Sequence, residues 1–290
     1  MTDNSFIKSL TQQEQINFLL TNRIPRRYFT LFMGWFSQLK NPLVKTLSLA
    51  VWKHFADDLN LEESKKTEFS SLHDCFIREL KPGSRPVEHA PNIVTSPCDA
   101  IVGAHGEIKG DELFQTKGFP YSLMDLFQNK SLVERYIDGY FITLRLKSTM
   151  YHRFHAPFHC RVGAINYISG DTWNVNPIAL KRVERLYCKN ERAVIDLELD
   201  DPGHHLTLVP VAAILVAGIK LHCLPAVLDL RYKGSHHLLC DSEFKKGDEM
   251  GYFQHGSTII IFANRKFSIN KDIYEGTVIR MGQALLRKNN

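Results

Sequence analysis

Several features that would assign this chain to a familiar class are missing from its sequence. None of the six cysteines belongs to a C-x-x-C pair, so a zinc ribbon or dithiol redox motif of that type is excluded. The longest apolar run, residues 208–219, contains Pro210 and Gly218 and is too short for a membrane-spanning helix of about 20 residues. The first ten residues lack the basic start and apolar stretch of a signal peptide. We therefore expect no spanning helix, no signal peptide, and a reducing compartment without a disulfide framework.

A metal-binding pattern is missing as well. His152, His155 and His159 have the i, i+3, i+7 spacing that would align them on one face of a helix. Pro157 lies inside that span, and no acidic residues of matching spacing accompany the histidines. We therefore expect no metal site.

The positive charge of the chain is concentrated at its beginning. The 290 residues are 44% apolar, enough for a sizeable core, and carry a net charge of +5. Residues 1–56 contain seven Lys or Arg against Asp3 and Glu14, and the rest of the chain is neutral. A basic N-terminal segment favours contact with an anionic partner.

Residues 1–70 have helical patterns. The capping-box spacing of Thr11 and Glu14 predicts a helix to about Asn22. Residues 26–40 repeat large apolar side chains at helical spacing: Tyr28, Phe32, Trp35, Phe36 and Leu39. A third helix, ending before Asp57, has one apolar face: Val44, Leu47, Val51 and Phe55.

Beyond about residue 85 the pattern is that of antiparallel strands. Short segments rich in Val, Ile and Tyr alternate with turn residues and predict strands at 101–108, 139–147, 161–168, 193–199, 206–219 and 258–263. One helix is expected at 121–130. The predicted fold class is α+β, with N-terminal helices followed by a β-rich, mostly antiparallel body, and a domain boundary between 1–70 and 71–290.

Four stretches of the β-rich part combine unusual polar residues: 96–100 with Asp99, 151–157 with His152 and His155, 173–177 followed by 190–192, and 256–258. Each has an ordinary structural explanation. Asp99 could close an Asx turn, the histidines could lie at the surface, and Gly256-Ser257-Thr258 could be a turn that opens a strand.

In order and spacing, these stretches resemble the phosphatidylserine decarboxylase proenzyme family. The resemblance covers roughly residues 70–265, with a weaker match around Gly34-Trp35. Its motifs are FIRELKPGSRP at 76–86, SPCD at 96–99, TKG at 116–118, YSL at 121–123, YHRFHAP at 151–157, VNP at 175–177, NER at 190–192, KGDEMGYF at 246–253 and GST at 256–258.

The sequence departs from the family's pattern in three places. Ala100 replaces the usual Gly, residues 148–150 read Ser-Thr-Met where Pro-Arg-Asp is frequent, and His255 stands where an apolar residue or Gly is more usual. None of these removes a proposed catalytic group, although His255 could alter the rate of processing.

The resemblance implies that the chain makes its own cofactor. Decarboxylation leaves a carbanion that needs an electron sink. In the family's scheme the Ser257 hydroxyl attacks the carbonyl of Gly256, the resulting ester is eliminated, and hydrolysis leaves a pyruvoyl group at residue 257. The products are the chains 1–256 and 257–290, which remain associated. The serine amine of the lipid then forms a Schiff base with the pyruvoyl carbonyl.

The same resemblance implies roles for three further residues. His155 would be the base that activates Ser257, with Asp99 as its orienting partner. His152 would place a proton on the carbanion carbon after carbon dioxide leaves.

A lipid substrate gives the basic, aromatic N-terminus a function. Residues 1–70 would attach the protein peripherally to an anionic membrane holding phosphatidylserine, at the cytoplasmic side of a bacterial-type cell membrane. Packing of the same helices on the β body is the simpler explanation, and both can hold for different faces. No nucleic-acid partner is expected, and homodimerisation stays open.

Two alternative functions remain from the sequence. One is pyruvoyl-dependent decarboxylation of a soluble amino acid. The other is non-catalytic lipid binding by a relative in which Ser257 is never converted.

Overall fold

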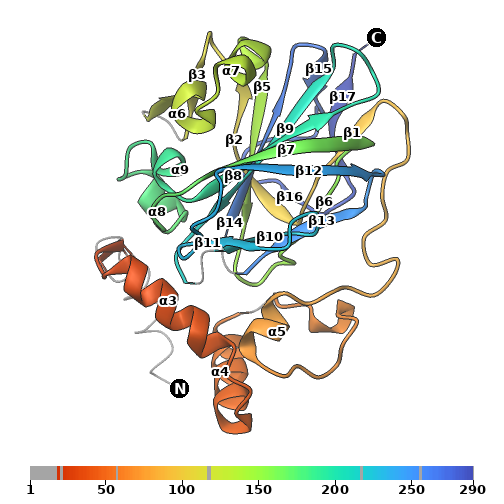
Figure 1. Cartoon of the computed structure of the whole chain (residues 1–290). Coiled ribbons are helices and arrows are strands. Elements are labelled where there is room, and N and C mark those ends of the chain that lie inside the picture. The colour runs from red at the N-terminus through yellow and green to blue at the C-terminus, as the bar shows by residue number, and fades with distance from the viewer. Residues whose placement is uncertain are drawn as a thin grey trace.

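The computed structural model describes residues 18–19, 22–56, 58–115, 119–215, 218–254 and 257–289, with Phe55 described by its backbone alone. The expected helix at 11–22, the Thr116-Lys117-Gly118 motif and both His255 and Gly256 lie wholly or largely outside these residues. The chain is an α+β fold, as expected: helices come first, and a mostly antiparallel β-rich body follows (Figure 1).

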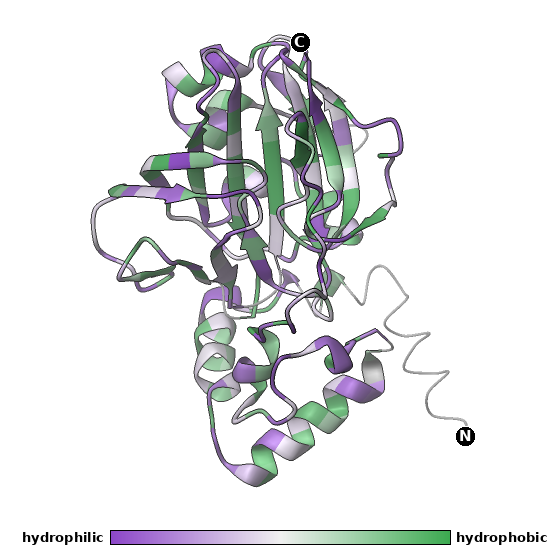
Figure 2. Ribbon diagram, turned by 90° about the vertical axis from the view of Figure 1, so that its right-hand side faces the viewer, coloured by the Kyte–Doolittle hydropathy of each residue, from purple (hydrophilic) through white to green (hydrophobic). Residues whose placement is uncertain are grey.

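Two long helices open the described part of the chain, and both were expected. They are α3 (Arg26–Ser37) and α4 (Pro42–Phe55). Asn41 begins α4, because its side-chain oxygen accepts hydrogen bonds from the backbone N–H groups of Leu43 and Val44, and Pro42 occupies the first turn. A 3₁₀ turn (Leu61–Glu63) and α5 (Leu72–Phe76) follow. These helices form a layer below the β body (Figures 1 and 2).

An eight-stranded sheet forms the centre of the body. Its strand order is β12-β7-β8-β9-β14-β5-β2-β16, and every pairing is antiparallel. The strands are β2 (Ala100–Glu107), β5 (Tyr140–Leu146), β7 (Cys160–Ile168), β8 (Arg192–Glu198), β9 (His205–Ala212), β12 (His237–Phe244), β14 (Ser257–Ala263) and β16 (Val278–Ile279).

Three smaller sheets accompany it. A four-stranded sheet contains β11 (Val227–Asp229), β10 (Gly218–Leu221), β13 (Glu249–Phe253) and β6 (Arg153–His155). A three-stranded sheet contains β1 (Ile93–Thr95), β17 (Ala284–Lys288) and β15 (Phe267–Ile269), and a hairpin pairs β3 (Glu112–Phe114) with β4 (Pro120–Ser122). The expected strand at 206–219 is therefore two strands, β9 and β10, in different sheets.

The helix expected at 121–130 is also divided. It forms α6 (Leu123–Phe127) and α7 (Lys130–Tyr136), because Gln128 has a left-handed backbone with φ of 52° and the Asn129 side chain caps the second helix. Two further short helices are α8 (Pro177–Leu180) and α9 (Leu186–Lys189).

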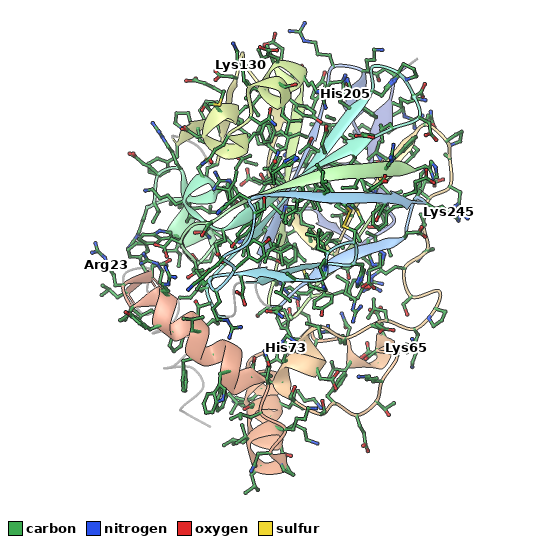
Figure 3. All side chains as sticks on the ribbon, viewed as in Figure 1. Arg23, Lys65, His73, Lys130, His205 and Lys245 are labelled. Carbon is green, nitrogen blue, oxygen red and sulfur yellow. A yellow bond between two sulfur atoms is a disulfide. The ribbon has the colours of Figure 1, made fainter. Side chains whose placement is uncertain are left out.

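Both faces of the central sheet are covered. Ile259 and Ile261 of β14 belong to the core between the large sheet and the smaller sheets, whereas Ile260 and Phe262 belong to a second core that includes α6, α7 and α9. Burial on both faces explains why this strand lacks the apolar–polar alternation of a half-exposed strand. Charged side chains such as Lys130 and Lys245 point outward (Figure 3).

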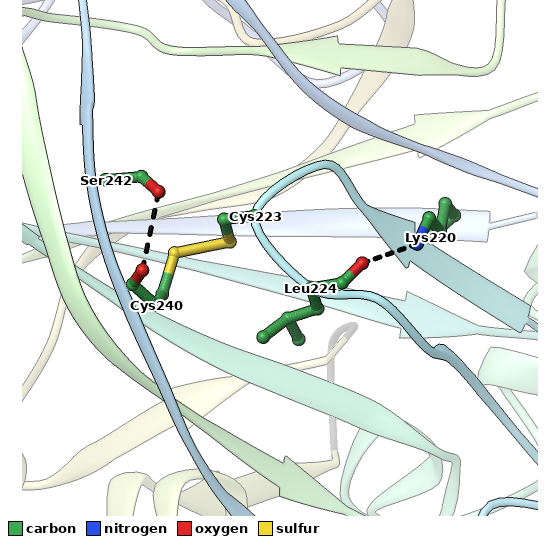
Figure 4. Close-up of a disulfide and its surroundings, with 5 residues drawn as sticks. All are labelled: Lys220, Cys223, Leu224, Cys240 and Ser242. Atoms are coloured by element: carbon green, nitrogen blue, oxygen red, sulfur yellow. Dashed lines mark hydrogen bonds between the residues drawn. A yellow bond between two sulfur atoms is a disulfide. The ribbon is translucent and has the colours of Figure 1, made fainter.

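The cysteine expectation needs a correction. Cys223 and Cys240 form a disulfide between the loop after β10 and strand β12 (Figure 4). The pair was invisible in the sequence because the fold brings together two cysteines that are 17 positions apart. The four other cysteines are free thiols.

Candidate active site

Ser257 is the first residue of the central strand β14. It lies opposite Leu146 of β5 and Ala212 of β9, and its side chain is completely buried. Its Oγ atom has no hydrogen-bond partner among the described residues. Buried hydroxyls are normally satisfied, so an orphan hydroxyl at a strand end is a candidate for a functional group.

A cavity of about 590 Å³ opens at this end of the sheet and includes Ser257 in its lining. Its walls come from the end of β5, from the segment after β9, from the segment before α8 and from the residues that follow α4. The described lining residues are Ala56, Asp58, Arg145, Leu146, Lys147, Ser148, Thr149, Asn174, Val175, Asn176, Ala213, Ile214, Leu215 and Ser257.

The motif 190–192 holds these walls in place. The buried Asn190 amide donates hydrogen bonds to the carbonyl oxygens of Trp173 and Ala212, at 2.8 and 2.9 Å. It thereby links Trp173, which precedes the cavity-lining residues 174–176, to Ala212, which pairs with Ser257. The fully buried Arg192 donates to the carbonyl oxygens of Asp125, Leu126, Cys188 and Asn190. These two residues position the site without entering it.

His155 ends strand β6 in the facing four-stranded sheet. Its Nδ1 lies 2.9 Å from the carbonyl oxygen of Gly247, and its Nε2 lies 3.0 Å from the Tyr151 hydroxyl. A carbonyl can only accept, so Nδ1 carries the proton and Nε2 keeps its lone pair. Burial lowers the pKa of His155. The ring is therefore held neutral, in the tautomer that a general base requires.

Asp99 lies close to His155 but bonds to other groups. Both of its carboxylate oxygens accept hydrogen bonds from Arg85, at 2.6–3.0 Å, and Oδ1 also accepts from the backbone N–H of Met281. The backbone N–H of His155 donates to the carbonyl oxygen of Pro97, two residues before Asp99. The negative charge of Asp99 acts to raise the pKa of His155, so the two residues interact electrostatically.

His152 is completely buried and lies beside the strand that leads to the expected cleavage position. Its Nδ1 is 2.8 Å from the carbonyl oxygen of Met150, its ring centroid is 4.0 Å from that of Phe76, and its own carbonyl accepts from the N–H of Phe253. The motif that begins at Phe76 thus packs on the imidazole, and its Nδ1, like that of His155, donates to a carbonyl.

The expected site residues Asp99, His152, His155 and Ser257 therefore lie around one end of the two facing sheets, but they do not form the direct hydrogen bonds of a catalytic triad. Among the described residues, no hydrogen bond joins Ser257 to His155 or His155 to Asp99. Ser257 belongs to the large sheet and His155 to the smaller one, and the two sheets share one core. Gly247 occupies the position at Nδ1 that we expected for Asp99.

Sequence reasoning missed Arg85, Tyr151 and Gly247 as parts of the site. All three lie inside motifs that were noticed, but spacing along the chain does not reveal which side chain each one contacts. The need for glycine at position 247 is visible only in the structure. Its φ is 89°, and a Cβ there would lie 2.9 Å from Val87, so glycine is required for this backbone to reach His155.

Glu191 has an unusual ionisation that the sequence did not indicate. It is almost completely buried, Oε1 accepts a 2.5 Å hydrogen bond from the Tyr167 hydroxyl, and Oε2 has no partner in the described part of the chain. Burial raises its pKa from 4.5 to about 7. Its backbone carbonyl accepts from the N–H of Ala212, the register neighbour of Ser257.

The described residues contain no group of three or more His, Cys, Asp or Glu side chains that could hold a metal ion. The His152, His155 and His159 series does not lie on a helix, because β6 and the turn after it occupy this segment.

Comparisons with known proteins agree with this geometry. The family model described as phosphatidylserine decarboxylase matches residues 72–287. A phosphatidylserine decarboxylase proenzyme from Saccharophagus degradans is 32% identical, covering 90% of this chain and 93% of its own. A protein of the same name from Brevibacillus brevis is 30% identical, covering 93% and 96%. Another, from Clostridium botulinum strain Alaska E43, is 35% identical, covering 86% and 79%.

Proposed function

Because the chain belongs to the phosphatidylserine decarboxylase family, we propose that it converts phosphatidylserine to phosphatidylethanolamine and carbon dioxide. The observation that carries the proposal is the Ser257 hydroxyl, which is buried without a partner at the cavity end of β14. A hydroxyl in that place is suited to attack the preceding carbonyl.

We infer that Ser257 is the source of a pyruvoyl group. Oγ attacks the carbonyl carbon of Gly256 and the peptide C–N bond breaks, which converts the amide into an ester. Elimination then releases the Gly256 carboxylate, and hydrolysis of the resulting dehydroalanine releases ammonia and leaves the pyruvoyl group at position 257. That group supplies the electron sink for decarboxylation when it is present.

His155 is the proposed base for this self-cleavage. Its neutral imidazole, with the lone pair on Nε2, fits proton removal from a hydroxyl. Tyr151 donates to that lone pair in the folded precursor, so the Tyr151 hydroxyl has to turn away before Nε2 takes the proton. Asp99, held by Arg85, would stabilise the imidazolium by charge rather than by a direct bond.

His152 is the proposed acid of the decarboxylation step. It would deliver a proton to the carbon from which carbon dioxide leaves. The Met150 carbonyl and the Phe76 ring orient the imidazole for this role.

The products of cleavage are expected to stay together. β14 is hydrogen-bonded on both sides, to β5 and β9, and β16 and β17 pair with β2 and β1. Residues 257–290 would therefore remain anchored by strands of the larger chain. This supports the division at Gly256–Ser257 as a processing event that leaves the fold intact.

The orientation of α3 supports peripheral membrane attachment. Its buried residues are polar, Thr30 and Ser37, while large apolar side chains face outward: Tyr28, Phe29, Phe32 and Trp35 are 77, 37, 52 and 60% exposed. A helix that merely packs on the body shows the opposite arrangement. In the described part of the chain no helix is both long and apolar enough to cross a bilayer.

The polar side of α3 is docked on the body. Arg26 forms an ion pair with Asp171 at 2.5 Å and lies 3.6 Å from the centre of the Trp173 ring. The exposed apolar surface continues on α4 through Leu43, Leu47 and Val51. Aromatic rings at headgroup depth and nearby basic residues would bind an anionic bilayer. The residues that follow α4 border the cavity, so lipid would enter from this side.

Intact-mass measurement tests the central proposal. The purified protein should consist of residues 1–256 and 257–290, the small chain being lighter by one ammonia than its sequence mass. Ser257→Ala should give a single uncut chain that releases no carbon dioxide from phosphatidylserine. An active preparation made of one intact chain with an unmodified serine would disprove the mechanism. Decarboxylation of free serine but not of the lipid would favour the soluble-substrate alternative.

A further inference from the structure

Arg145 is an arginine of the cavity that the proposed chemistry does not use. It lies on β5 directly opposite Thr258 and one residue before Leu146, the partner of Ser257. It is half-buried and lines the cavity together with Ser257. In the described chain its guanidinium makes no hydrogen bond and no ion pair, and burial lowers its pKa.

Other buried arginines of this chain have several partners. Arg192 donates to four carbonyl oxygens, Arg85 binds Asp99 and Glu63, and Arg78 donates to three carbonyls. Withdrawing a charge from water without a partner is unfavourable, so such a group is normally paired. An arginine left unpaired at a cavity wall therefore points to an anion that enters the cavity.

The neighbouring cation does not fill this role. Lys147, which directly follows the last residue of β5, also lines the cavity but is paired with Asp58 at 3.4 Å. Among the described lining residues, Asp58, Arg145 and Lys147 are the only charged groups. Because Asp58 is paired with Lys147, the charge of Arg145 is uncompensated.

We propose, on the basis of the proposed function, that Arg145 binds the phosphodiester group of the lipid substrate. The headgroup offers two anions, a carboxylate and a phosphodiester. The carboxylate leaves as neutral carbon dioxide, and a cation that stabilised its charge would hold back the reaction by stabilising the ground state. The phosphodiester keeps its charge throughout, so binding it positions the substrate without that penalty. The planar guanidinium also matches two phosphate oxygens at once.

Calorimetric titration of the mature protein with two soluble probes tests this assignment. Glycerophosphoethanolamine carries the phosphodiester without a carboxylate, and O-methylserine carries the carboxylate without a phosphodiester. Arg145→Gln should weaken binding of the first probe about 10- to 100-fold, the loss of a charge-assisted bidentate contact, and leave the second unchanged. Arg145→Lys keeps the charge but loses the planar two-donor geometry of the guanidinium. Its affinity for glycerophosphoethanolamine should therefore lie between those of the parent and Arg145→Gln.

Lys147→Gln is the matched control, since it removes a cation that lines the same cavity, two residues after Arg145, and already has Asp58 as a partner. Its effect on the first probe should stay below about 3-fold. The inference is overturned if Arg145→Gln weakens only O-methylserine, if both cations matter equally, or if the parent protein does not bind the phosphodiester probe.

Carbon dioxide release from phosphatidylserine, measured in parallel, separates this inference from the proposed function. In one outcome, the parent binds the phosphodiester probe, Arg145→Gln loses this binding, and the parent releases no carbon dioxide. This outcome would support the anion site and refute the proposed decarboxylase activity. In the other outcome, the parent is active and neither Arg145→Gln nor Arg145→Lys changes the KM for phosphatidylserine. This outcome would support the decarboxylase activity and refute the anion site.

Discussion

The Nδ1 atom of His155 lies 2.9 Å from the carbonyl oxygen of Gly247, and this contact leaves the lone pair of the imidazole on Nε2. Gly247 is followed by β13, and His155 ends β6, the partner of β13 in the four-stranded sheet. A backbone carbonyl thus supplies the orienting contact that a carboxylate supplies in a serine hydrolase triad. The tautomer of the proposed base therefore depends on the backbone conformation of Gly247.

Gly247→Ala should slow self-cleavage strongly. The left-handed φ of 89° is unfavourable for alanine by about 1–2 kcal/mol, and relaxation of the backbone would move the carbonyl away from His155. Gly276→Ala is the control, since its φ is 93° and, apart from its chain neighbours, no atom of the described residues lies within 4 Å of the added Cβ. Both variants should lose stability in urea denaturation, Gly247→Ala at least as much as Gly276→Ala because its Cβ also meets Val87. Under conditions where both remain folded, only Gly247→Ala should accumulate uncut chain on a gel. Equal processing of the two would refute the orienting role.

His155→Ala should accumulate full-length protein, and Asp99→Asn should process slowly. Because the pKa of His155 is lowered, cleavage of the parent should persist below the ordinary histidine value of about 6.5 and decline only at more acidic pH. Asp99 acts to raise that pKa, so Asp99→Asn should move the acid decline to lower pH. Rates of precursor cleavage across a pH series provide the measurement. Normal cleavage of His155→Ala would transfer the base role to another histidine.

His152→Ala should separate the two reactions. Self-cleavage should proceed, because the proposed base and nucleophile remain, whereas decarboxylation should fall by at least about 100-fold through loss of the general acid. Intact mass and carbon dioxide release from the same preparation give both readouts. A variant that neither cleaves nor decarboxylates would place His152 in processing instead.

Phe32→Ser combined with Trp35→Ser should release the protein from anionic vesicles. Salt screens the contribution of Lys and Arg, so the apolar contact should dominate at moderate ionic strength, where the Debye length is about 10 Å or less. Leu239→Ser with Tyr274→Ser, which removes apolar residues that are 79 and 65% exposed outside α3 and α4, is the control. Vesicle co-sedimentation across a salt series compares the two, and self-cleavage should continue in both. Unchanged sedimentation of the first pair at every salt level would move the membrane contact elsewhere.

Glu191 should make folding stability decrease as pH rises. Its folded pKa is about 7 against 4.5 for the exposed group, so the folded chain holds the proton more tightly. The contribution is complete below pH 4.5, is lost progressively up to about pH 7, and amounts to ~3 kcal/mol in total. Glu191→Gln should remove this component. Urea denaturation of parent and variant at pH 5 and pH 8 measures it, and equal pH dependence of the two proteins would contradict the prediction.

The sequence by itself determined the classes of element and the order of the motifs. Apolar spacing predicted α3 and α4, and runs of Val, Ile and Tyr predicted the strands, because these patterns reflect local geometry and burial. The ordered motifs were sufficient to identify the family. The predicted roles of Ser257, His155, Asp99 and His152 also came from that order, and they remain proposals.

Only the tertiary structure decided which side chains meet. Asp99 and His155 lie close enough to interact electrostatically, yet the carboxylate of Asp99 is bonded to Arg85 and the imidazole of His155 to the carbonyl of Gly247. The disulfide between Cys223 and Cys240 and the unpaired Arg145 arise in the same way. Contacts between strands far apart in sequence depend on register and on sheet packing, which are global properties of the chain. A local pattern of residues does not contain them.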